Sequence, residues 1–280
     1  MSSDDHGQDE TLALEAGRSA ARFSTEAGRL TSLVLNGHEV IVGPAEPQPP
    51  RGSWFWGSFV MAPWTSLIRD ATFDFAGDTH WLATDDGRHA VLGLTWKLPW
   101  RIDGDRLVCD LGGPDGVAAG WPFGGRVMIM PELAEDRLRV VLRVEAGDQE
   151  QPAAIGWHPW FVRELAGSAP VELGLTGPVR RQHRDPDEAP TGLWQSVDPA
   201  ERDFNDCLRV GGPTTLTWPG VGSLEIAHDS PYVTVYSVHP DGICVEPVTS
   251  PAERMDDLLR PGEVLDLTID IRWIGEEENQ

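Results

Sequence analysis

The chain has 280 residues with 40% hydrophobic content, which suffices for a substantial core and argues against bulk disorder. It carries 45 acidic and 22 basic side chains, a net charge of −23. Nucleic acids and anionic membranes are both bound through basic faces, so this charge argues against either as a partner. The acidity could reflect a high internal salt concentration or a solubilising surface, and the charge alone does not distinguish the two.

The three cysteines are widely spaced and include no Cys-x-x-Cys pair. This pattern predicts neither a disulfide framework nor a cysteine-rich zinc site. The N-terminal residues lack the basic-then-apolar plan of a signal peptide, and no apolar run approaches the roughly 18–20 residues of a membrane span. We therefore expect a reducing, cytoplasmic location and no membrane association.

Residues 1–10 are acidic and are predicted to form a solvated tail. The segments 30–35 and 38–42 then flank Asn36-Gly37, the dipeptide most typical of a two-residue β-hairpin turn. We expect these two segments to pair as antiparallel strands.

Later segments alternate between apolar and polar residues in the way that half-buried strands do. The alternation is clearest in 138–144 and 265–273, and 232–238 is rich in β-branched and aromatic residues. One short helix is predicted over 251–259, with Pro at an early position and Pro261-Gly262 ending it.

With 30 glycines and 23 prolines, few windows are long enough for an extended helix. Many short strands at regular spacing favour an all-β fold, a large antiparallel β-sandwich or a barrel with few short helices. We predict a single domain over 11–274, between the acidic tail at 1–10 and a frayed tail at 275–280.

His158 stands directly before Pro159 and between Trp157 and Trp160. The proline restricts the backbone of His158 to extended or turn geometry, so the imidazole is not expected in the middle of a helix. Neighbouring rings would partly exclude water and lower the pKa of the histidine, which suits proton transfer near neutral pH. The alternative is a packed core histidine beside a turn.

Glu246 follows the apolar residues Ile243, Cys244 and Val245 and precedes Pro247. A carboxylate at the end of a buried strand is costly unless it is paired or has a function. Glu246 is therefore a candidate general base, or alternatively a strand-end glutamate bonded to a nearby turn.

Other chemistries lack their usual signatures in this sequence. There is no His-x-His or His-Glu-x-x-His spacing for a metal, no Gly-x-Ser-x-Gly nucleophile motif and no glycine-rich phosphate loop before a helix. We expect no metal and no cofactor, and the remaining chemistry is proton transfer between one histidine and one glutamate.

Aromatic residues lie close to these candidate segments. The chain has 12 tryptophans and two tyrosines, and most of the tryptophans are expected to pack in the core. Sugars commonly stack on flat aromatic faces, which makes Trp64 and Trp160 candidates for substrate contact. Arg69, Asp70, His80 and His89 lie near Trp64 in sequence, although each taken singly is more typical of a surface residue.

The sequence resembles the aldose 1-epimerase (galactose mutarotase-like) family over nearly its whole length, from Thr11 to Trp273. The motifs that carry the resemblance are 156–161, similar to Gly-x-His-Pro-aromatic-Phe, and 245–249, similar to Glu-Pro-x-Thr. Shorter supporting matches are 61–64, 189–192, 205–207 and 261–263.

The resemblance implies a twisted antiparallel β-sandwich, of the galactose mutarotase-like supersandwich type, whose concave face holds a sugar. It also implies a mechanism without a cofactor. Glu246 would take the proton of the anomeric hydroxyl while His158 protonates the ring oxygen. The ring opens, the aldehyde rotates, and closure with reversed proton roles gives the other anomer.

Two polar residues of the family pattern are replaced in this chain. The family arginine falls on Leu67, and we expect Arg69, two residues further on, to share its strand face and compensate. A second family histidine falls on Leu92, with His89 three residues away. These changes make the expected pocket less polar, and a ligand hydroxyl left unpaired there would cost affinity and selectivity.

The sugar-binding aspartate of the family falls on Asn205, with Asp206 adjacent. The predicted substrate-binding set is Arg69, His89, Asn205, Asp206, Trp64 and Trp160.

Three functions remain open from the sequence. The first is a mutarotase acting on a free aldose or a hexose derivative, as a monomer or homodimer. The second is a carbohydrate-binding or sugar-sensing protein on the same fold with weakened turnover. A glycoside hydrolase would need two carboxylates flanking the scissile bond, and only Glu246 has a suitable context.

Overall fold

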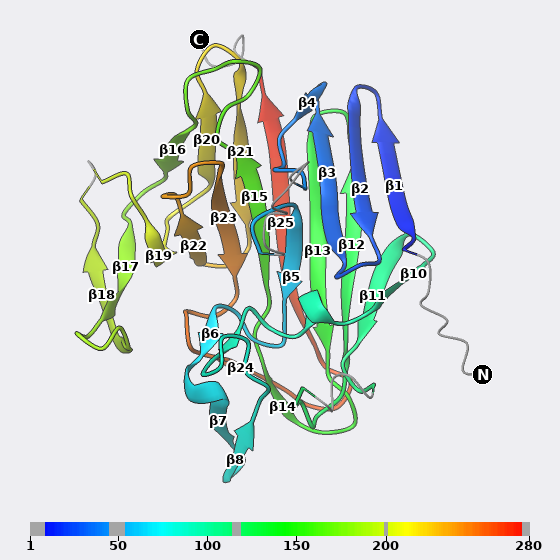
Figure 1. Cartoon of the computed structure of the whole chain (residues 1–280), viewed down its shortest axis with the longest axis vertical. Helices are drawn as coiled ribbons and strands as arrows, with labels where there is room; N and C mark the ends of the chain where they lie inside the picture. The colour runs from blue at the N-terminus through cyan, green and yellow to red at the C-terminus, as the bar shows by residue number, and fades with distance from the viewer. Residues whose placement is uncertain (1–8, 45–53, 114–118, 199–200, 276–280) are drawn as a thin grey trace.

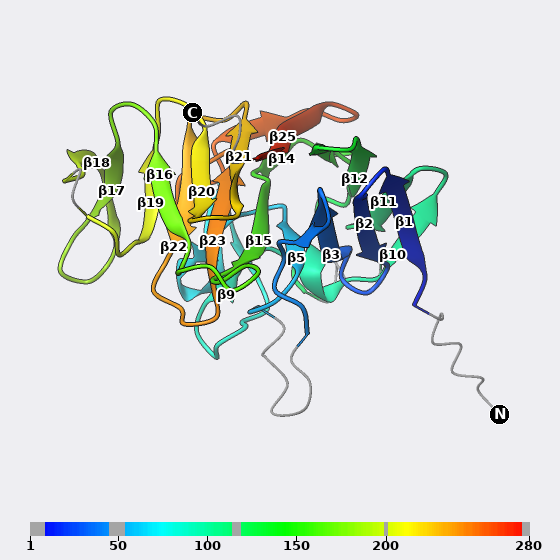
Figure 2. The same cartoon turned by 90° about the horizontal axis from the view of Figure 1, so that it is seen from above.

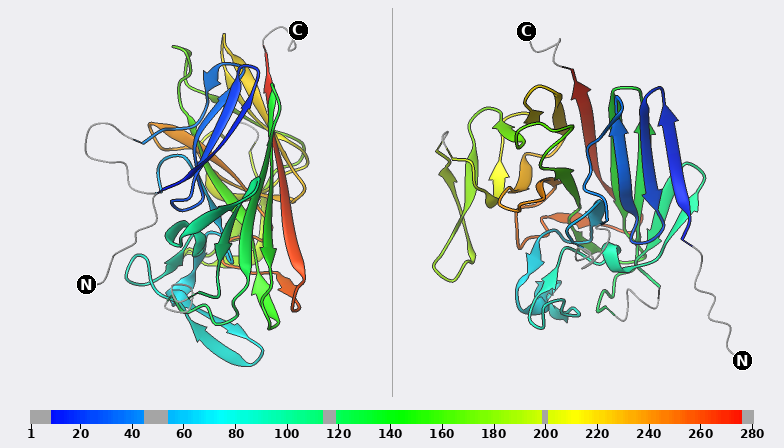
Figure 3. Two further views of the ribbon diagram at one scale, coloured as in Figure 1. Left: turned by 90° about the vertical axis from the view of Figure 1, so that its right-hand side faces the viewer. Right: turned by 45° about the horizontal axis from the view of Figure 1, so that its top comes forward.

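A computed structural model describes residues 9–44, 54–113, 119–198 and 201–275. Most of the two predicted tails, 1–8 and 276–280, lies outside these ranges. The described strands form two large antiparallel sheets packed face to face, as the side view shows (Figure 3). The predicted all-β sandwich is therefore confirmed.

The larger sheet has 11 strands and runs across the front of the molecule in Figure 1. Its order is β1-β2-β3-β5-β15-β23-β22-β19-β17-β18, with β4 paired to β3. The bounds are β1 (Thr11–Ala16), β2 (Ser19–Ser24), β3 (Arg29–Leu35), β4 (His38–Glu39), β5 (Ser58–Met61), β15 (Gly156–Val162), β17 (Arg180–Arg184), β18 (Pro190–Ser196), β19 (Asn205–Arg209), β22 (Tyr232–Tyr236) and β23 (Gly242–Val248).

The smaller sheet has eight strands in the order β10-β11-β12-β13-β25-β21-β20-β16, and lies behind the first (Figure 2). The bounds are β10 (Trp100–Asp103), β11 (Arg106–Asp110), β12 (Arg126–Leu133), β13 (Arg137–Glu145), β16 (Glu172–Leu175), β20 (Thr214–Trp218), β21 (Gly222–His228) and β25 (Val264–Ile274).

Three two-stranded ribbons gather at the lower end of the view in Figure 1. Two 3-10 turns, η1 and η2, accompany them, and the described residues contain no longer helix. The remaining bounds are β6 (Leu67–Ile68), β7 (Thr72–Phe75), β8 (Asp78–Trp81), β9 (Ala90–Val91), β14 (Gln151–Ala153), β24 (Asp257–Leu259), η1 (Arg69–Ala71) and η2 (Thr95–Lys97).

The strand β13 shows how the sequence specifies the sandwich. Leu138, Val140, Leu142 and Val144 are buried, while the intervening residues are half-buried or exposed. Because successive side chains point to opposite faces, one face of β13 enters the core and the other carries charge. Arg143 forms a bidentate ion pair with Asp266 on the neighbouring β25, with both N–O distances at 2.7 Å.

The core between the sheets forms one large apolar cluster that draws on both of them. Its largest fully buried side chains include Trp64, Trp121, Trp157 and Trp218. Most of the tryptophan side chains are therefore buried in the protein interior, as the sequence predicts.

Four of the predicted strand segments are observed as β3, β13, β22 and β25. Asn36 and Gly37 form the turn between β3 and β4 with φ of 49° and 86°, in agreement with the expected hairpin. The strand predicted over 38–42 is shorter than expected, since only His38–Glu39 are strand and Ile41 makes an isolated bridge.

The helix predicted over 251–259 is wrong. Residues 257–259 form β24, which pairs with β14 through Gln151↔Leu259 and Ala153↔Asp257. The side chain of Ser250 accepts a hydrogen bond from the Asp256 amide at 3.0 Å and closes the preceding segment as a turn. Pairing with a distant strand overrides the local helix signal here.

No helix among the described residues is long and apolar enough to cross a membrane.

Leu142 tests the sandwich core, because its side chain is fully buried at the centre of β13. Leu142→Ala removes one methine and two methyl carbons and leaves a cavity, so we expect a loss of about 2–5 kcal/mol in the free energy of unfolding. Chemical denaturation measures this loss. Leu193→Ala, at a side chain that is 65% exposed, should change stability by less than about 0.5 kcal/mol. Equal effects of the two changes would contradict the assigned core.

Candidate active site

The strands β15 and β23 are neighbours in the larger sheet and carry the two predicted acid–base residues. Their register pairs Gly156 with Val248 and Trp160 with Cys244, which places His158 opposite Glu246. Trp157 and Val245, on the same strands, point into the core between the sheets. Strand alternation therefore turns His158 and Glu246 to the other face of the sheet.

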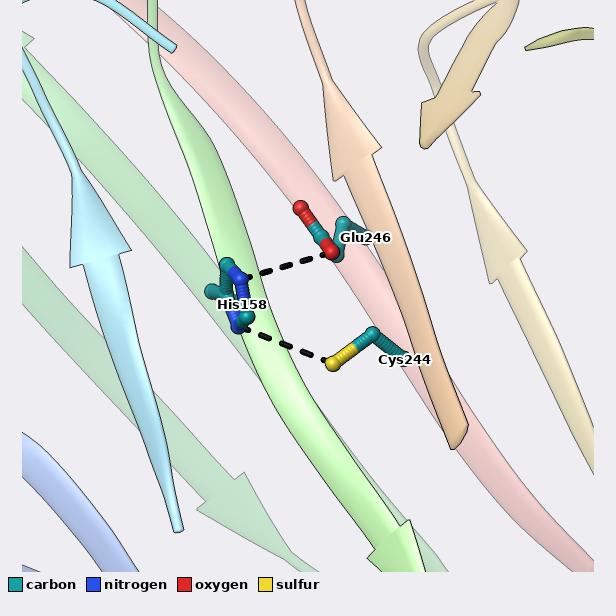
Figure 4. Close-up of side chains that lie close together, drawn as sticks. All are labelled: His158, Cys244 and Glu246. Carbon is teal, nitrogen blue, oxygen red and sulfur yellow. Dashed lines mark hydrogen bonds and ion pairs between the residues drawn. The ribbon is translucent and has the colours of Figure 1, made fainter. Parts of the chain in front are cut away.

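The side chains of His158, Glu246 and Cys244 lie close together on that face (Figure 4). His158 Nε2 is 3.4 Å from Glu246 Oε1, and His158 Nδ1 is 3.7 Å from the Sγ of Cys244. Cys244 and Glu246 are two residues apart on β23, so both face the ring, one at each nitrogen. The histidine and glutamate predicted from distant parts of the sequence are thus brought together.

Phe59 and Arg29 extend this group across the sheet towards β3. Phe59 pairs with His158 in the register of β5 and β15, and their rings stack with centroids 4.7 Å apart. The Arg29 guanidinium lies 5.3 Å from the Phe59 centroid and 4.4 Å from that of Trp56, and Arg29 Nη1 donates to the Trp56 carbonyl at 2.6 Å. Arg29 is thus a buried cation held on aromatic faces next to the histidine.

Two small apolar clusters border the pair on the same face. One contains Val42, Trp160 and Cys244, with Phe55, Trp56, Val162 and Tyr236 packed against it. The other contains Phe59, Met61 and Val248, with Trp54, Leu92, Trp96 and Tyr232 packed against it. His158 and Glu246 are left only 8% and 4% exposed between these walls.

Burial dominates the electrostatics of the pair. It lowers the pKa of His158 to about 3, although a hydrogen bond to its own backbone raises it and the charge of Arg29 lowers it further. Burial also raises the pKa of Glu246 to about 8, against the lowering effect of a hydrogen bond from Cys244. In the free protein at neutral pH, the imidazole is therefore neutral and the carboxyl group holds the proton.

Burial, together with the nearby Glu246, likewise raises the pKa of the Cys244 thiol well above its usual value. One ligand atom from each of His158, Cys244 and Glu246 lies within 4.8 Å of the others, so these residues could reach a common metal ion. The two ring nitrogens of His158 are turned to different partners, however: Nε2 faces the Glu246 carboxyl and Nδ1 faces the Cys244 thiol.

Leu92 lies in the wall of the site, where it packs in the cluster of Phe59 and Val248. Its backbone has φ of 61°, an uncommon value for leucine, and its amide donates to the Ser66 carbonyl at 2.6 Å. The next residue, Gly93, approaches the backbone of Ala62 so closely that a Cβ would come within 2.5 Å of the Ala62 nitrogen. The fold therefore holds Leu92 at this position.

Arg69 does not share a strand face with Leu67, and that part of the prediction is wrong. The strand β6 ends at Ile68, and Arg69 begins a 3-10 turn in which Asp70 has φ of 52°. Arg69 forms a bidentate ion pair with Glu253, with its Nε at 3.0 Å and its Nη2 at 2.9 Å from the carboxylate oxygens. Both residues line a cavity of about 470 Å³ beside β7 and β24.

His89 is half-buried in a turn capped by Asp86, whose carboxylate accepts hydrogen bonds from the amides of Arg88 and His89. The His89 Nδ1 accepts a hydrogen bond from the Asp70 amide at 3.0 Å. The described hydrogen bonds of Arg69 and His89 are therefore made with residues such as Glu253, Asp70 and Asp86, and not with His158 or Glu246.

Asn205 and Asp206 point to opposite faces of the larger sheet. Asn205 pairs with Tyr236, which pairs with Cys244, so the Asn205 side chain is on the face of His158 and Glu246. Asp206 pairs with Val235 and its carboxylate lies 3.7 Å from Arg181 Nη2. Of these two predicted binding residues, the structure places Asn205 on the candidate site's face.

The two tryptophans predicted to contact substrate also separate. Trp160 borders the site, with its ring centroid 6.0 Å from that of His158, and its indole N–H donates to the Trp54 carbonyl. Trp64 is fully buried in the main core and contacts Trp121. A fully buried ring offers no free face, so Trp64 stays outside the candidate site.

Sequence reasoning did not assign Phe59, Cys244, Arg29 or Tyr236 to the site. Cys244 could have been found, because it stands two residues before Glu246 in a strand and must share its face. Phe59 and Arg29 reach His158 only through the pairing of β3, β5 and β15, which no local pattern in the sequence reveals.

Comparison with known proteins agrees with the observed fold. Residues 10–236 match the model of the aldose 1-epimerase family, and the chain therefore belongs to that family. The match includes His158 and ends before β23, so the position of Glu246 rests on the structure. A search of curated proteins found no match.

Solved structures with the same fold are similar over nearly the full length of both chains. A putative aldose 1-epimerase from Escherichia coli has a TM-score of 0.77 at 16% identity, covering 95% of this chain and 99% of the other. A galactose mutarotase-like protein from Clostridium acetobutylicum has a TM-score of 0.81 at 14% identity, with 96% and 98% covered. Galactose 1-epimerase from Lactobacillus acidophilus has a TM-score of 0.77 at 17% identity, with 98% and 97% covered. At these identities the likeness shows the fold.

The raised pKa of Glu246 predicts a pH-dependent gain in stability when its charge is removed. The folded-state pKa of about 8 exceeds the ordinary value of 4.5, so the stability contributed by the carboxyl is full below pH 4.5 and is lost as pH rises through 8. Glu246→Gln carries no such proton. We expect its melting temperature, relative to wild type, to increase by several degrees between pH 5 and pH 9.

Glu132→Gln, at an exposed position, is the matched control and should show no such trend. Thermal unfolding followed by circular dichroism at each pH measures both. A constant difference between Glu246→Gln and wild type across this pH range would contradict the buried carboxyl.

Proposed function

We propose that this protein is an aldose 1-epimerase that interconverts the α and β anomers of a free aldose or a hexose derivative. Glu246 is the general base and His158 the general acid. The observation that supports this assignment is the 3.4 Å contact between a buried carboxyl and a buried imidazole, on a sheet face bordered by aromatic rings. Membership of the aldose 1-epimerase family points to the same reaction.

In the proposed reaction Glu246 takes the proton of the hydroxyl on the anomeric carbon as the bond to the ring oxygen breaks. His158 Nε2 donates its proton to the released ring oxygen, and an open-chain aldehyde results. Opening leaves Glu246 protonated and His158 short of one proton. After rotation of the aldehyde, closure reverses both transfers and gives the other anomer, so no proton is gained or lost overall.

The electrostatics of the site suit this division of roles. A neutral imidazole with a lowered pKa can act as an electrophile or proton donor, as in triosephosphate isomerase. Glu246 must first lose its proton, and the buried charge of Arg29, on the far side of Phe59, helps to keep His158 neutral. The apolar clusters around His158 and Glu246 strengthen the electrostatic interactions of the pair, because little water screens them.

The substrate is proposed to be less hydroxylated than galactose, or modified. Leu92 presents a methyl-bearing side chain where a hydrogen-bonding residue would be expected, and Arg69 is neutralised by Glu253. Trp160 and Tyr236 offer aromatic surface, and Asn205 offers an amide on the same face.

We further propose that the protein acts in the cytoplasm as a monomer or homodimer, without a nucleic-acid or membrane partner. The three cysteines are free and buried, which fits a reducing compartment.

A second candidate is a sugar-binding or sugar-sensing protein with little turnover. The apolar position of Leu92 favours it, since a hydroxyl that faces Leu92 gains no hydrogen bond in the transition state.

Loss of either catalytic group should abolish most of the anomer exchange. We expect Glu246→Gln and His158→Asn each to lower kcat/KM for mutarotation by about 10²–10⁴-fold, the usual contribution of general acid–base catalysis. Polarimetry or NMR exchange over a panel of aldoses, including deoxy and acidic sugars, measures the rate above the spontaneous one. His183→Asn, which replaces a histidine bonded to Thr191 on β18, is the matched control and should retain wild-type activity.

Full activity in Glu246→Gln would contradict the acid–base assignment. If the wild-type protein binds a sugar in calorimetry but does not accelerate mutarotation, the enzyme hypothesis is rejected in favour of the sugar-binding protein.

The pH dependence follows from the same pKa values. Because the base must be ionised, kcat/KM should rise about tenfold per pH unit below pH 8 and level off above it. His158 stays neutral above about pH 3 and adds no limb in this range. The titratable groups near Glu246 are His158, Cys244 and, across Thr234 on the next strand, Cys207. A bell-shaped profile centred below pH 7 would contradict these assignments.

A further inference from the structure

Cys244 contacts the ring nitrogen of His158 that takes no part in the proposed chemistry. Its Sγ is 3.7 Å from Nδ1, while Nε2 faces Glu246 at 3.4 Å. Cys244 is completely buried. Figure 4 shows this arrangement, with the thiol on the Nδ1 side of the imidazole and the carboxyl group on the Nε2 side.

A neutral imidazole carries a single N–H, which resides on either Nδ1 or Nε2. The hydrogen bond made by one nitrogen decides the state of the other. For His158 to protonate a ring oxygen from Nε2, its Nδ1 must accept a hydrogen bond. We propose that Cys244 is a positioning residue for mutarotation, whose S–H donates to Nδ1 of His158 and so keeps the proton on Nε2. This proposal rests on the proposed function of the pair.

The thiol is able to donate because burial keeps it protonated. It also lies near the Glu246 carboxyl, which competes for the same S–H. In the free protein that carboxyl holds its own proton, which makes Nδ1 the stronger acceptor. In the complex, the carboxylate accepts a hydrogen bond from the anomeric hydroxyl while Nε2–H faces the ring oxygen, and this leaves the thiol for Nδ1.

Without the thiol, Nδ1 loses its donor, and the ring keeps its contact with Glu246 at Nε2 and a hydrogen bond to the backbone of His158 itself. A backbone carbonyl accepts and cannot donate, so it favours a proton on Nδ1. The Nε2 atom would then have no proton to give. The loss of one sulfur atom should therefore change the tautomer of His158 and leave its position largely unchanged.

The test compares Cys244→Ala, which has no donor, with Cys244→Ser, which keeps one. Long-range ¹H–¹⁵N correlation spectra distinguish the two imidazole tautomers, and the His158→Asn spectrum identifies the signals of His158 among the eight histidines. We expect the Nε2–H form in wild type and Cys244→Ser, and the Nδ1–H form in Cys244→Ala. The tautomer can be read whether or not the protein proves to be a mutarotase.

In the active protein, kcat should fall about 10²-fold in Cys244→Ala with KM little changed, because only the transition state needs the Nε2 proton. Cys244→Ser should retain activity within about tenfold of wild type. Cys109→Ala is the matched control, since Cys109 is equally buried but lies on β11 of the other sheet; it creates the same cavity and should leave kcat unchanged.

An Nε2–H tautomer in Cys244→Ala would overturn the proposal, as would equal kcat values for the alanine and serine variants. A changed tautomer with wild-type kcat would overturn it as well. If the wild-type protein shows no mutarotase activity, the proposed function is rejected instead. The spectra then still show whether Cys244 sets the tautomer of His158.

Discussion

The register between β15 and β23 is the constraint on which the candidate site depends. It places an imidazole opposite a carboxyl group on the face of the 11-stranded sheet that points away from the core between the sheets. Both groups would be charged or partly charged in water, and burial disfavours their charged forms. The free protein therefore holds a neutral pair, in which the proton resides on Glu246. On the proposed function such a pair suits proton transfer, because Glu246 can ionise once a substrate hydroxyl supplies a hydrogen bond.

The same register couples the chemistry to the core. Trp157 and Val245 fill the space between the sheets, and their neighbours His158 and Glu246 must then point the other way. A slip of one residue between the strands would exchange these faces and bury two polar groups in the main core. The packing of the sandwich thus fixes the direction of the His158 and Glu246 side chains, and the aromatic walls built by β5 and β15 keep water from them.

The sequence predicts well what depends on local pattern. Period-two alternation revealed β13 and β25, Asn36-Gly37 revealed a hairpin, and the aromatic surroundings of His158 revealed a dry histidine. It fails where distant segments decide the structure. The segment 257–259 is a strand because β14 lies beside it, and Arg69 leaves the face of Leu67 because η1 turns the chain towards Glu253. The stack of Phe59 on His158 is likewise a product of sheet pairing, which a single sequence does not show.

The surroundings of the pair are unevenly polar. On the side of β5 and β9, Phe59, Met61 and Leu92 form an apolar wall. On the side of β19 and β22, Tyr236 and Asn205 carry polar atoms on the site's face. On the proposed function, a sugar would be held through hydroxyls on one side and through a bare or substituted carbon on the other. A site built this way rejects a fully hydroxylated sugar by leaving its hydroxyls unpaired. The departures from the family pattern would then alter which sugar is accepted, while the proton transfers that His158 and Glu246 carry out with the sugar would stay the same.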